Sequence, residues 1–184
     1  MAAMAYYARN LPHWHPENRA ILLTFRLYGS LPVDVVKRLS RLQKEPRKQF
    51  LEAERNLDSA RSGPKWLAEP AVAGLVESAL LHGQTELSFY LLEAYVIMPN
   101  HVHALFQPLV PLPRITKGIK GVSARQANVA LGRSGKPFWQ DESFDHWVRD
   151  LAQLERIRSY IEMNPVKAGL AKSPVEWRWS SAHT

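Results

Sequence analysis

The chain has 184 residues, with 24 Lys or Arg against 17 Asp or Glu, and a formal net charge of +7. With 46% hydrophobic and 22% charged residues, it has the composition of a globular domain, not of a disordered polyelectrolyte. The absence of cysteine excludes a disulfide framework, a thiolate zinc site and a cysteine nucleophile. No apolar run reaches the ~20 residues of a membrane span, and the first residues lack a signal-peptide pattern, so we expect a soluble, cytoplasmic protein.

The first half of the chain predicts one strand followed by three helices. Residues 20–28 are apolar, aromatic and β-branched, as in a buried strand. Prolines favour helix starts near residues 32, 46 and 70, because proline is tolerated in the first turn. We expect the last of these helices to end at Gly83.

The second half predicts a β-hairpin and a capped helix. Two strand-like runs, 88–98 and 101–107, flank Pro99-Asn100, which favours a turn. Asp150 can cap a following helix, and Asn164 before a proline can end it. The buried stripe expected for this helix consists of Leu151, Leu154, Ile157 and Ile161.

The positive charge is concentrated in one segment. Residues 111–140 contain no acid and several glycines. A flexible basic segment suits a polyanion, because each cation near a phosphate releases condensed counterions; a solvated basic surface is the alternative. A helix is expected over its first half. The cations of this segment are Arg114, Lys117, Lys120, Arg125, Arg133 and Lys136.

Two histidines stand two residues apart at the start of the second hairpin strand. His101 and His103 share one face of a strand, with Cα atoms ~6.6 Å apart. Two neutral imidazoles at this spacing can converge on one cation. Surface or core histidines are the alternative interpretation of such a pair.

A tyrosine and an asparagine stand one turn apart in the last predicted helix. Tyr160 and Asn164 lie on the same helical face, at the edge of the buried stripe. Ordinary packing of the tyrosine and helix termination by the asparagine are the alternatives. Taken with the histidines, the set describes a metal-assisted attack of a tyrosine hydroxyl on a phosphodiester.

Three motifs occur together in one order: PNHVHALF, then PFWQDESFDHWVRD, then YIEMNPVKAGL. In this combination the chain resembles the REP-associated tyrosine transposases, which belong to the single-tyrosine branch of the HUH nuclease superfamily. The likeness covers about residues 88–180. It implies an α+β fold with a ferredoxin-like or RRM-like antiparallel sheet packed by helices, in a single domain over 1–184.

The resemblance also implies an activity and its residues. The family's metal-binding histidines correspond to His101 and His103, its nucleophile to Tyr160 and its third metal ligand to Asn164. Such enzymes cut single-stranded DNA beside hairpins, leaving a 5′-phosphotyrosine and a free 3′-OH, with Mg²⁺ or Mn²⁺. The chain departs from the family pattern by a long helical insertion at about 46–83.

Other residues and readings complete these expectations. Trp139 can stack an unpaired base or anchor the last helix, and Lys167 can contact a phosphate. A second pair, His13 and His15, lies between Pro12 and Pro16, so a loop is expected there, and the pair is not expected to bind metal. A dormant DNA-binding protein of the same fold remains an alternative, while a triple-histidine nucleotide hydrolase is disfavoured by Leu105. The oligomeric state is left open between monomer and homodimer.

Overall fold

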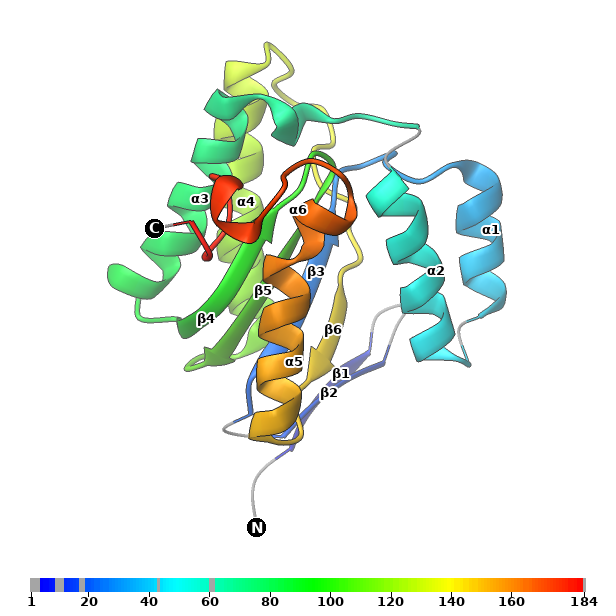
Figure 1. Ribbon diagram of the computed structural model, residues 1–184, viewed down its shortest axis with the longest axis vertical. Helices are drawn as coiled ribbons and strands as arrows, with labels where there is room; N and C mark the ends of the chain where they lie inside the picture. The colour runs from blue at the N-terminus through cyan, green and yellow to red at the C-terminus, as the bar shows by residue number, and fades with distance from the viewer. Residues whose placement is uncertain (1–3, 9–11, 17–18, 43, 60–61, 184) are drawn as a thin grey trace.

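A computed structural model describes residues 4–8, 12–16, 19–42, 44–59 and 62–183 of the chain. Four antiparallel strands form the central sheet, in the spatial order β4-β5-β3-β6 (Figure 1). Their bounds are β3 (Ile21–Arg26), β4 (Tyr90–Ile97), β5 (His101–Pro108) and β6 (Phe144–Trp147). The sheet packed by helices confirms the predicted α+β class.

Side-chain alternation gives the sheet two different faces. Val102, Ala104 and Phe106 of β5 join one buried apolar cluster, together with residues of α3 (Pro70–Thr85) and α4 (Leu112–Ala130). The opposite face is covered in part by α5 (Leu151–Glu162), which packs on Leu105 and its neighbours. We call these the α3/α4 face and the α5 face. His101 and His103 share the alternation of Leu105 and therefore lie on the α5 face.

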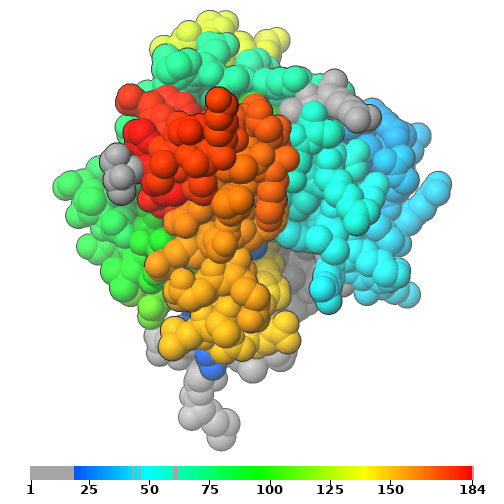
Figure 2. Space-filling model, viewed as in Figure 1, coloured from blue at the N-terminus to red at the C-terminus, as the bar shows by residue number. Residues whose placement is uncertain are grey.

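Two helices form a unit of their own beside the sheet. Helix α1 (Val33–Arg41) packs on α2 (Pro46–Ser59), and their contact is a separate apolar cluster that includes Leu39, Ala53 and Leu57. We call them the α1–α2 unit. Figure 2 shows α2 lying beside α5 and the short helix α6 (Asn164–Lys167), so the unit borders the α5 face.

The remaining elements are short. A separate two-stranded sheet pairs β1 (Met4–Ala8) with β2 (Pro12–Pro16). Two 3₁₀ turns, η1 (Trp66–Ala68) and η2 (Pro174–Glu176), lie before α3 and after α6. No helix of the described ranges is long and apolar enough to cross a membrane.

Two expectations about helix ends and faces were wrong. Helix α3 does not stop at Gly83 but continues to Thr85, and Gly83 is buried against the ring of Tyr90. A Cβ at Gly83 would collide with that ring, so glycine serves close approach here instead of a helix end. Leu151 was expected in the buried stripe of α5 but is 80% exposed, because it occupies the first position after the Asp150 cap.

The glycine-containing basic segment is not flexible over its first part. Residues 112–130 form the single helix α4, although Gly118 and Gly121 lie inside it. Gly118 allows the ring of Phe89 to approach, and Ile115 and Ile119 anchor the helix in the core, so packing overrides the low helix propensity of glycine. The loop-like expectation for residues 12–16 was also wrong, since they form β2. The side chains of His13 and His15 lie outside the described residues.

Candidate metal and tyrosine site

The two histidines of β5 are completely buried and face each other. His101 and His103 are each 0% exposed, with Nε2 atoms 3.1 Å apart and ring centroids 4.8 Å apart. The turn at Pro99-Asn100 starts the strand directly before them, and Met98 N–H donates to the His101 carbonyl to close the hairpin. The two histidines were predicted to lie on the same face of a strand, and the structure shows in addition that their imidazoles are in direct contact.

The outer nitrogen of each imidazole is held by a neighbour. Nδ1 of His101 lies 2.7 Å from Oδ1 of Asn100, whose Nδ2 donates to the Leu57 carbonyl and so fixes the orientation of the amide. Because Oδ1 only accepts, Nδ1 of His101 carries the proton and its Nε2 presents a lone pair. On β3, Thr24 pairs opposite His103 and its hydroxyl lies 2.7 Å from Nδ1 of that ring. Both Nε2 atoms are thereby left to face the site, an arrangement typical of metal-binding histidines.

A carboxylate of the α1–α2 unit completes the cluster, and the sequence analysis missed it. Glu54 of α2 is 4% exposed, and its Oε2 lies 3.1 Å from Nε2 of His103. One ligand atom each from Glu54, His101 and His103 lies within 4.8 Å of the other two. One turn further along α2, Oδ1 of Asp58 lies 3.8 Å from Nε2 of His101. Glu54, His101 and His103 form the only cluster of potential metal ligands found among the described residues.

The phenol of Tyr160 points into the same cluster from α5. Its ring packs edge-on against His103, with centroids 5.6 Å apart, and its hydroxyl donates to Oε2 of Glu54. The ammonium of Lys167 lies 4.8 Å from the centre of the Tyr160 ring. The structure therefore brings three of the predicted site residues, His101, His103 and Tyr160, around the unpredicted Glu54.

Asn164 lies at the start of α6, one turn after Tyr160. It is 1% exposed, and its Oδ1 and Nδ2 make no hydrogen bond of standard geometry within the described part of the chain, although its amide lies near enough to the Tyr160 phenol to act on the pKa of that group. A buried amide without partners costs free energy, so such a group is expected where a ligand supplies the missing interaction. Asn164 thus has the properties of an oxygen donor beside the tyrosine.

Burial and charge set the protonation states of the site. Burial, reinforced by the neighbouring His103, lowers the pKa of His101 to about 3, so this imidazole is neutral at pH 7. Burial raises the pKa of Glu54, but the adjacent His103 and the hydrogen bond from Tyr160 outweigh it and bring the pKa to about 2. Burial and the charge of Glu54 raise the pKa of Asp58 to about 6. Burial and the same carboxylate raise the pKa of Tyr160 well above its usual value.

This donor set fits a divalent cation. Neutral imidazole, ionised carboxylate and an unpartnered amide oxygen are all metal ligands, and the imidazoles carry the outer hydrogen bonds that orient ligating histidines. Two imidazoles with oxygen donors suit Mn²⁺ and later transition metals better than Mg²⁺, which prefers oxygen alone. The cluster therefore indicates a divalent-metal site without fixing the metal.

The other tyrosines of this region are directed elsewhere. Tyr90 and Tyr95 pack with the cluster of the α3/α4 face, on the opposite side of the sheet from the histidines. The Tyr90 hydroxyl donates to the Leu80 carbonyl, and the Tyr95 hydroxyl donates to Glu77. Leu105, the position of a third histidine in a nucleotide hydrolase, is fully buried among apolar residues. Of these tyrosines, only Tyr160 reaches the histidine cluster.

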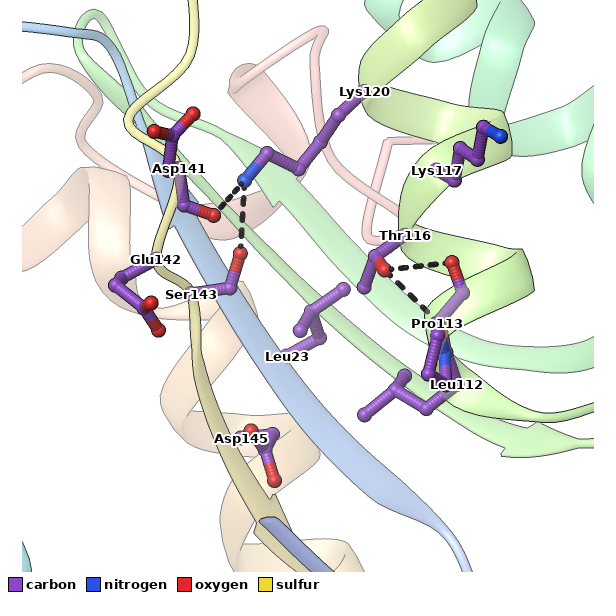
Figure 3. Close-up of a pocket in the computed structure, with 10 residues that line it drawn as sticks. All are labelled: Leu23, Leu112, Pro113, Thr116, Lys117, Lys120, Asp141, Glu142, Ser143 and Asp145. Atoms are coloured by element: carbon purple, nitrogen blue, oxygen red, sulfur yellow. Dashed lines mark hydrogen bonds between the residues drawn. The ribbon is translucent and has the colours of Figure 1, made fainter. Parts of the chain in front are cut away.

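The basic residues expected to bind DNA lie mostly on α4, across the sheet from the site. Arg114, Lys117 and Arg125 are exposed on this helix. The ammonium of Lys120 instead donates to the Asp141 carbonyl and the Ser143 hydroxyl (Figure 3). It also donates to the Gln140 carbonyl. These bonds cross one end of a cavity of about 390 Å³ between α4 and the β6 segment.

The candidate DNA-binding residues after α4 differ in how far their side chains are exposed to solvent. Lys136 is exposed, whereas the guanidinium of Arg133 lies 3.9 Å from the centre of the Trp66 ring. Trp139 is 6% exposed, donates its indole N–H to Ser123 and packs edge-on against Phe25. Trp139 is therefore a core residue, and of the two roles considered for it, this burial argues against base stacking and for a packing role. The exposed Lys167 lies at the site itself, over Tyr160.

A signal for Glu54 is present in the sequence of α2. Glu54 and Asp58 are like charges one turn apart, a spacing that destabilises an isolated helix. Each follows a residue of the buried α1–α2 contact, Ala53 and Leu57, so both lie at the edge of an apolar stripe. Two acids at that position are typical of a shared cationic partner, although the sequence does not say which.

Comparisons with known proteins agree on one family. Residues 67–164, more than half of the chain, match the family described as "Transposase IS200 like". A relative from Escherichia coli (strain K12), a "REP-associated tyrosine transposase", is 26% identical over 98 residues, which are 50% of this chain and 54% of the relative. The chain thus matches about half the length of that curated relative.

A solved structure supports the fold. The "REP associates tyrosine transposase bound to a REP hairpin" superposes with a TM-score of 0.61 at 18% identity, over 98% of this chain and 84% of that one. At this identity the likeness concerns the fold alone. The family match contains His101, His103, Tyr160 and Asn164, but it begins after Glu54 and Asp58.

Proposed function

Because the chain belongs to the family of IS200-like transposases, we propose that it cuts and transfers single-stranded DNA beside hairpin-forming repeats, with Tyr160 as nucleophile. The observation that carries the proposal is the contact between the Tyr160 phenol and the cluster of Glu54, His101 and His103. A hydroxyl placed at a metal-binding cluster is suited to attack on a phosphodiester.

The covalent step exchanges one phosphate ester for another. The phenol of Tyr160 loses its proton and its oxygen bonds to phosphorus, while the bond from phosphorus to the 3′ oxygen breaks. The departing oxygen takes up a proton to become a free 3′-OH, so no net proton is gained or lost. The downstream strand stays joined to the enzyme as a 5′-phosphotyrosine. Attack by a DNA 3′-OH on that ester reverses the step and transfers the strand.

The chain's own residues divide this work. His101, His103 and Asn164 would hold a divalent cation, Mg²⁺ or Mn²⁺, and such a cation would offset negative charge on the phosphoryl oxygens. Thr24 and Asn100 orient the two imidazoles through their Nδ1 atoms. Lys167, over the ring of Tyr160, supplies positive charge beside the attacking oxygen and the phosphate.

DNA binding is proposed for exposed cations away from the chemistry. Arg114, Lys117, Arg125 and Lys136 bind the phosphate backbone, and Arg133 adds to them when it leaves Trp66. Lys120 supports this surface indirectly, because its ammonium holds the β6 segment against α4. Hairpin DNA is the proposed partner, since the structural relative is one bound to a REP hairpin.

A covalent-adduct assay tests the proposal. Oligonucleotides with a palindromic hairpin, randomised single-stranded flanks and a label at the 3′ end are incubated with protein and Mn²⁺. We expect a labelled protein band on a denaturing gel, lost in Tyr160→Phe and kept in Tyr95→Phe, the matched control on the opposite face. Tyr160→Phe removes one oxygen and keeps the ring packing, so hairpin binding persists.

Two outcomes would overturn parts of this assignment. An adduct that survives in Tyr160→Phe would move the nucleophile to another residue. Hairpin binding without any adduct, by wild-type protein and with either metal, would instead support the dormant DNA-binding alternative.

A further inference from the structure

The α1–α2 unit directs two carboxylates of one helix at the two histidines. Glu54 lies opposite His103, at 3.1 Å, and Asp58 lies opposite His101, at 3.8 Å. The acids are one turn of α2 apart, and the histidines are two residues of β5 apart. The unit therefore meets the sheet through groups that also form the candidate metal centre.

Several polar atoms at this contact between α2 and β5 are buried without a hydrogen-bond partner from the described residues. Oε1 of Glu54, Oδ1 of Asp58 and both amide atoms of Asn164 are buried without hydrogen-bond partners within the described ranges. Two like charges one turn apart repel each other, and buried oxygens without partners cost free energy. A cation among these oxygens and the two Nε2 atoms would remove both costs.

The apolar contacts between the unit and the sheet are few. The buried core of the α1–α2 unit is its own cluster, and two partly buried rings join it to the sheet: Phe144 of β6 packs against this cluster, and Phe50 of α2 packs against the cluster of the α5 face. Phe50 of α2 packs edge-on against Phe144 of β6, at 6.0 Å between ring centres, and Asn100 donates to the Leu57 carbonyl. Polar contacts at the site thus make up much of the attachment.

We propose that Glu54 is a metal ligand carried by the α1–α2 unit, and that a divalent cation shared by Glu54, His101 and His103 fastens this unit to the sheet. The inference rests on the metal centre of the proposed function and adds to it a ligand from outside the segment that matches the family. A carboxylate oxygen beside two imidazoles favours Mn²⁺ among the ions considered.

The proposal links the unit to the nucleophile. The oxygen of Glu54 that faces His103 is also the acceptor for the Tyr160 hydroxyl. A cation bound by that carboxylate would therefore lie beside the Tyr160 hydroxyl. Docking of the α1–α2 unit, cation binding and the position of the Tyr160 hydroxyl are coupled through this one oxygen.

Metal titration and hydrogen exchange test the inference without any DNA. The full-length chain is titrated with Mn²⁺ by calorimetry, and backbone exchange of peptides covering residues 46–59 is measured by mass spectrometry in Mn²⁺ and in EDTA. We expect Mn²⁺ to slow exchange in these peptides at least about tenfold, because a fastened helix opens less often. Glu54→Gln should lose this slowing and at least about tenfold in Mn²⁺ affinity.

Matched variants separate failure of the inference from failure of the proposed function. Glu52→Gln, on the same helix but facing Arg38 at 3.3 Å, should bind Mn²⁺ like the wild type. His101→Ala with His103→Ala should abolish binding; unchanged affinity there would overturn the metal centre itself. If the histidines are required but Glu54→Gln binds normally, or if Mn²⁺ leaves exchange of residues 46–59 unchanged, the fastening role of Glu54 is wrong.

Discussion

The two faces of the central sheet are built from the same strands but differ in what they leave unsatisfied. On the α3/α4 face, Val102, Ala104 and Phe106 of β5 are sealed by two long helices. On the α5 face, His101 and His103 of the same strand lie beyond the apolar contact with α5, where polar groups of α2 meet them. Packing on the α3/α4 face therefore contributes most to specifying the fold, and part of the α5 face is left to hold polar groups suited to chemistry.

The largest expected effect comes from opening the apolar face. Phe106 is fully buried and packs against the Tyr90 ring, with centroids 4.9 Å apart. We expect Phe106→Ala to lower the free energy of unfolding by about 3–5 kcal/mol, because truncation leaves a cavity that α3 and α4 cannot close. Urea denaturation followed by circular dichroism measures it. A loss below about 1 kcal/mol would mean that this face is not the one that specifies the fold.

On the α5 face, a substitution at Thr24 of β3 should change the Mn²⁺ affinity more than the free energy of unfolding. Thr24→Val keeps the shape of the side chain but removes the hydroxyl next to Nδ1 of His103. We expect Mn²⁺ affinity to fall about 10–100-fold, as is typical when an outer partner of a ligating histidine is lost. Calorimetric titration of Thr24→Val beside Thr24→Ser, which retains the hydroxyl, checks this. Equal affinities in the two variants would remove Thr24 from the site.

Acid should destabilise the protein through His101, a group of the α5 face. Its folded pKa is lowered to about 3, whereas the unfolded chain binds a proton below ~6.5, so stability falls as the pH drops from about 6.5 toward 3. Between pH 7 and pH 5 this costs about 2 kcal/mol. In EDTA, His101→Gln should therefore lose less stability than the wild type over this interval, as measured by urea denaturation.

Asp58 should act with the opposite sign in the same experiment. Its folded pKa is raised to about 6, above the unfolded value of ~3.9, so protonation favours the folded state as the pH falls through 6. Asp58→Asn removes that contribution and should make the protein more sensitive to acid than the wild type. If the free energy of unfolding changes with pH in the same way in Asp58→Asn and the wild type, the pKa of this carboxyl is not raised in the folded state.

The smallest expected effect concerns the exposed cations on and after α4. Replacing Lys117, Arg125 and Lys136 by Gln should lower the slope of log Kd against log salt for hairpin DNA by up to about 2–3, since each lost phosphate contact removes ~0.7–0.9. Stability should barely change. Fluorescence anisotropy at several salt concentrations measures the slope, and Glu155→Gln on α5 is the control. An unchanged slope would place the DNA elsewhere on the molecule.

The sequence predicted the part of the site that follows from local periodicity. Alternation along β5 placed His101 and His103 on one face, and the helical repeat placed Tyr160 and Asn164 one turn apart. The strands predicted at 20–28, 88–98 and 101–107 and the cap at Asp150 were confirmed for the same reason, whereas the short strand β6 was not predicted. These features depend only on residues a few positions apart in the chain, so they can be predicted from a single sequence.

What depended on docking between distant segments was not predictable. Glu54 reaches His103 only because the α1–α2 unit packs beside α5, and in sequence its helix resembles a solvated charged one. The sequence left base stacking open for Trp139, because its burial depends on contacts with Ser123 and Phe25, which are distant in the sequence. The helix expected over the first half of the basic segment was confirmed, but it continues to Ala130, because packing against the core outweighs the low helix propensity of two glycines.

Asn100 makes the hairpin turn a junction between two parts of the molecule that no other residue type can serve in the same way. Its amide oxygen faces the His101 ring while its amide nitrogen donates to the backbone of α2. Aspartate would set an oxygen against the Leu57 carbonyl, and glutamine is one carbon too long for a fully buried place. A graft of the α1–α2 unit onto a related scaffold would therefore need this asparagine to travel with it.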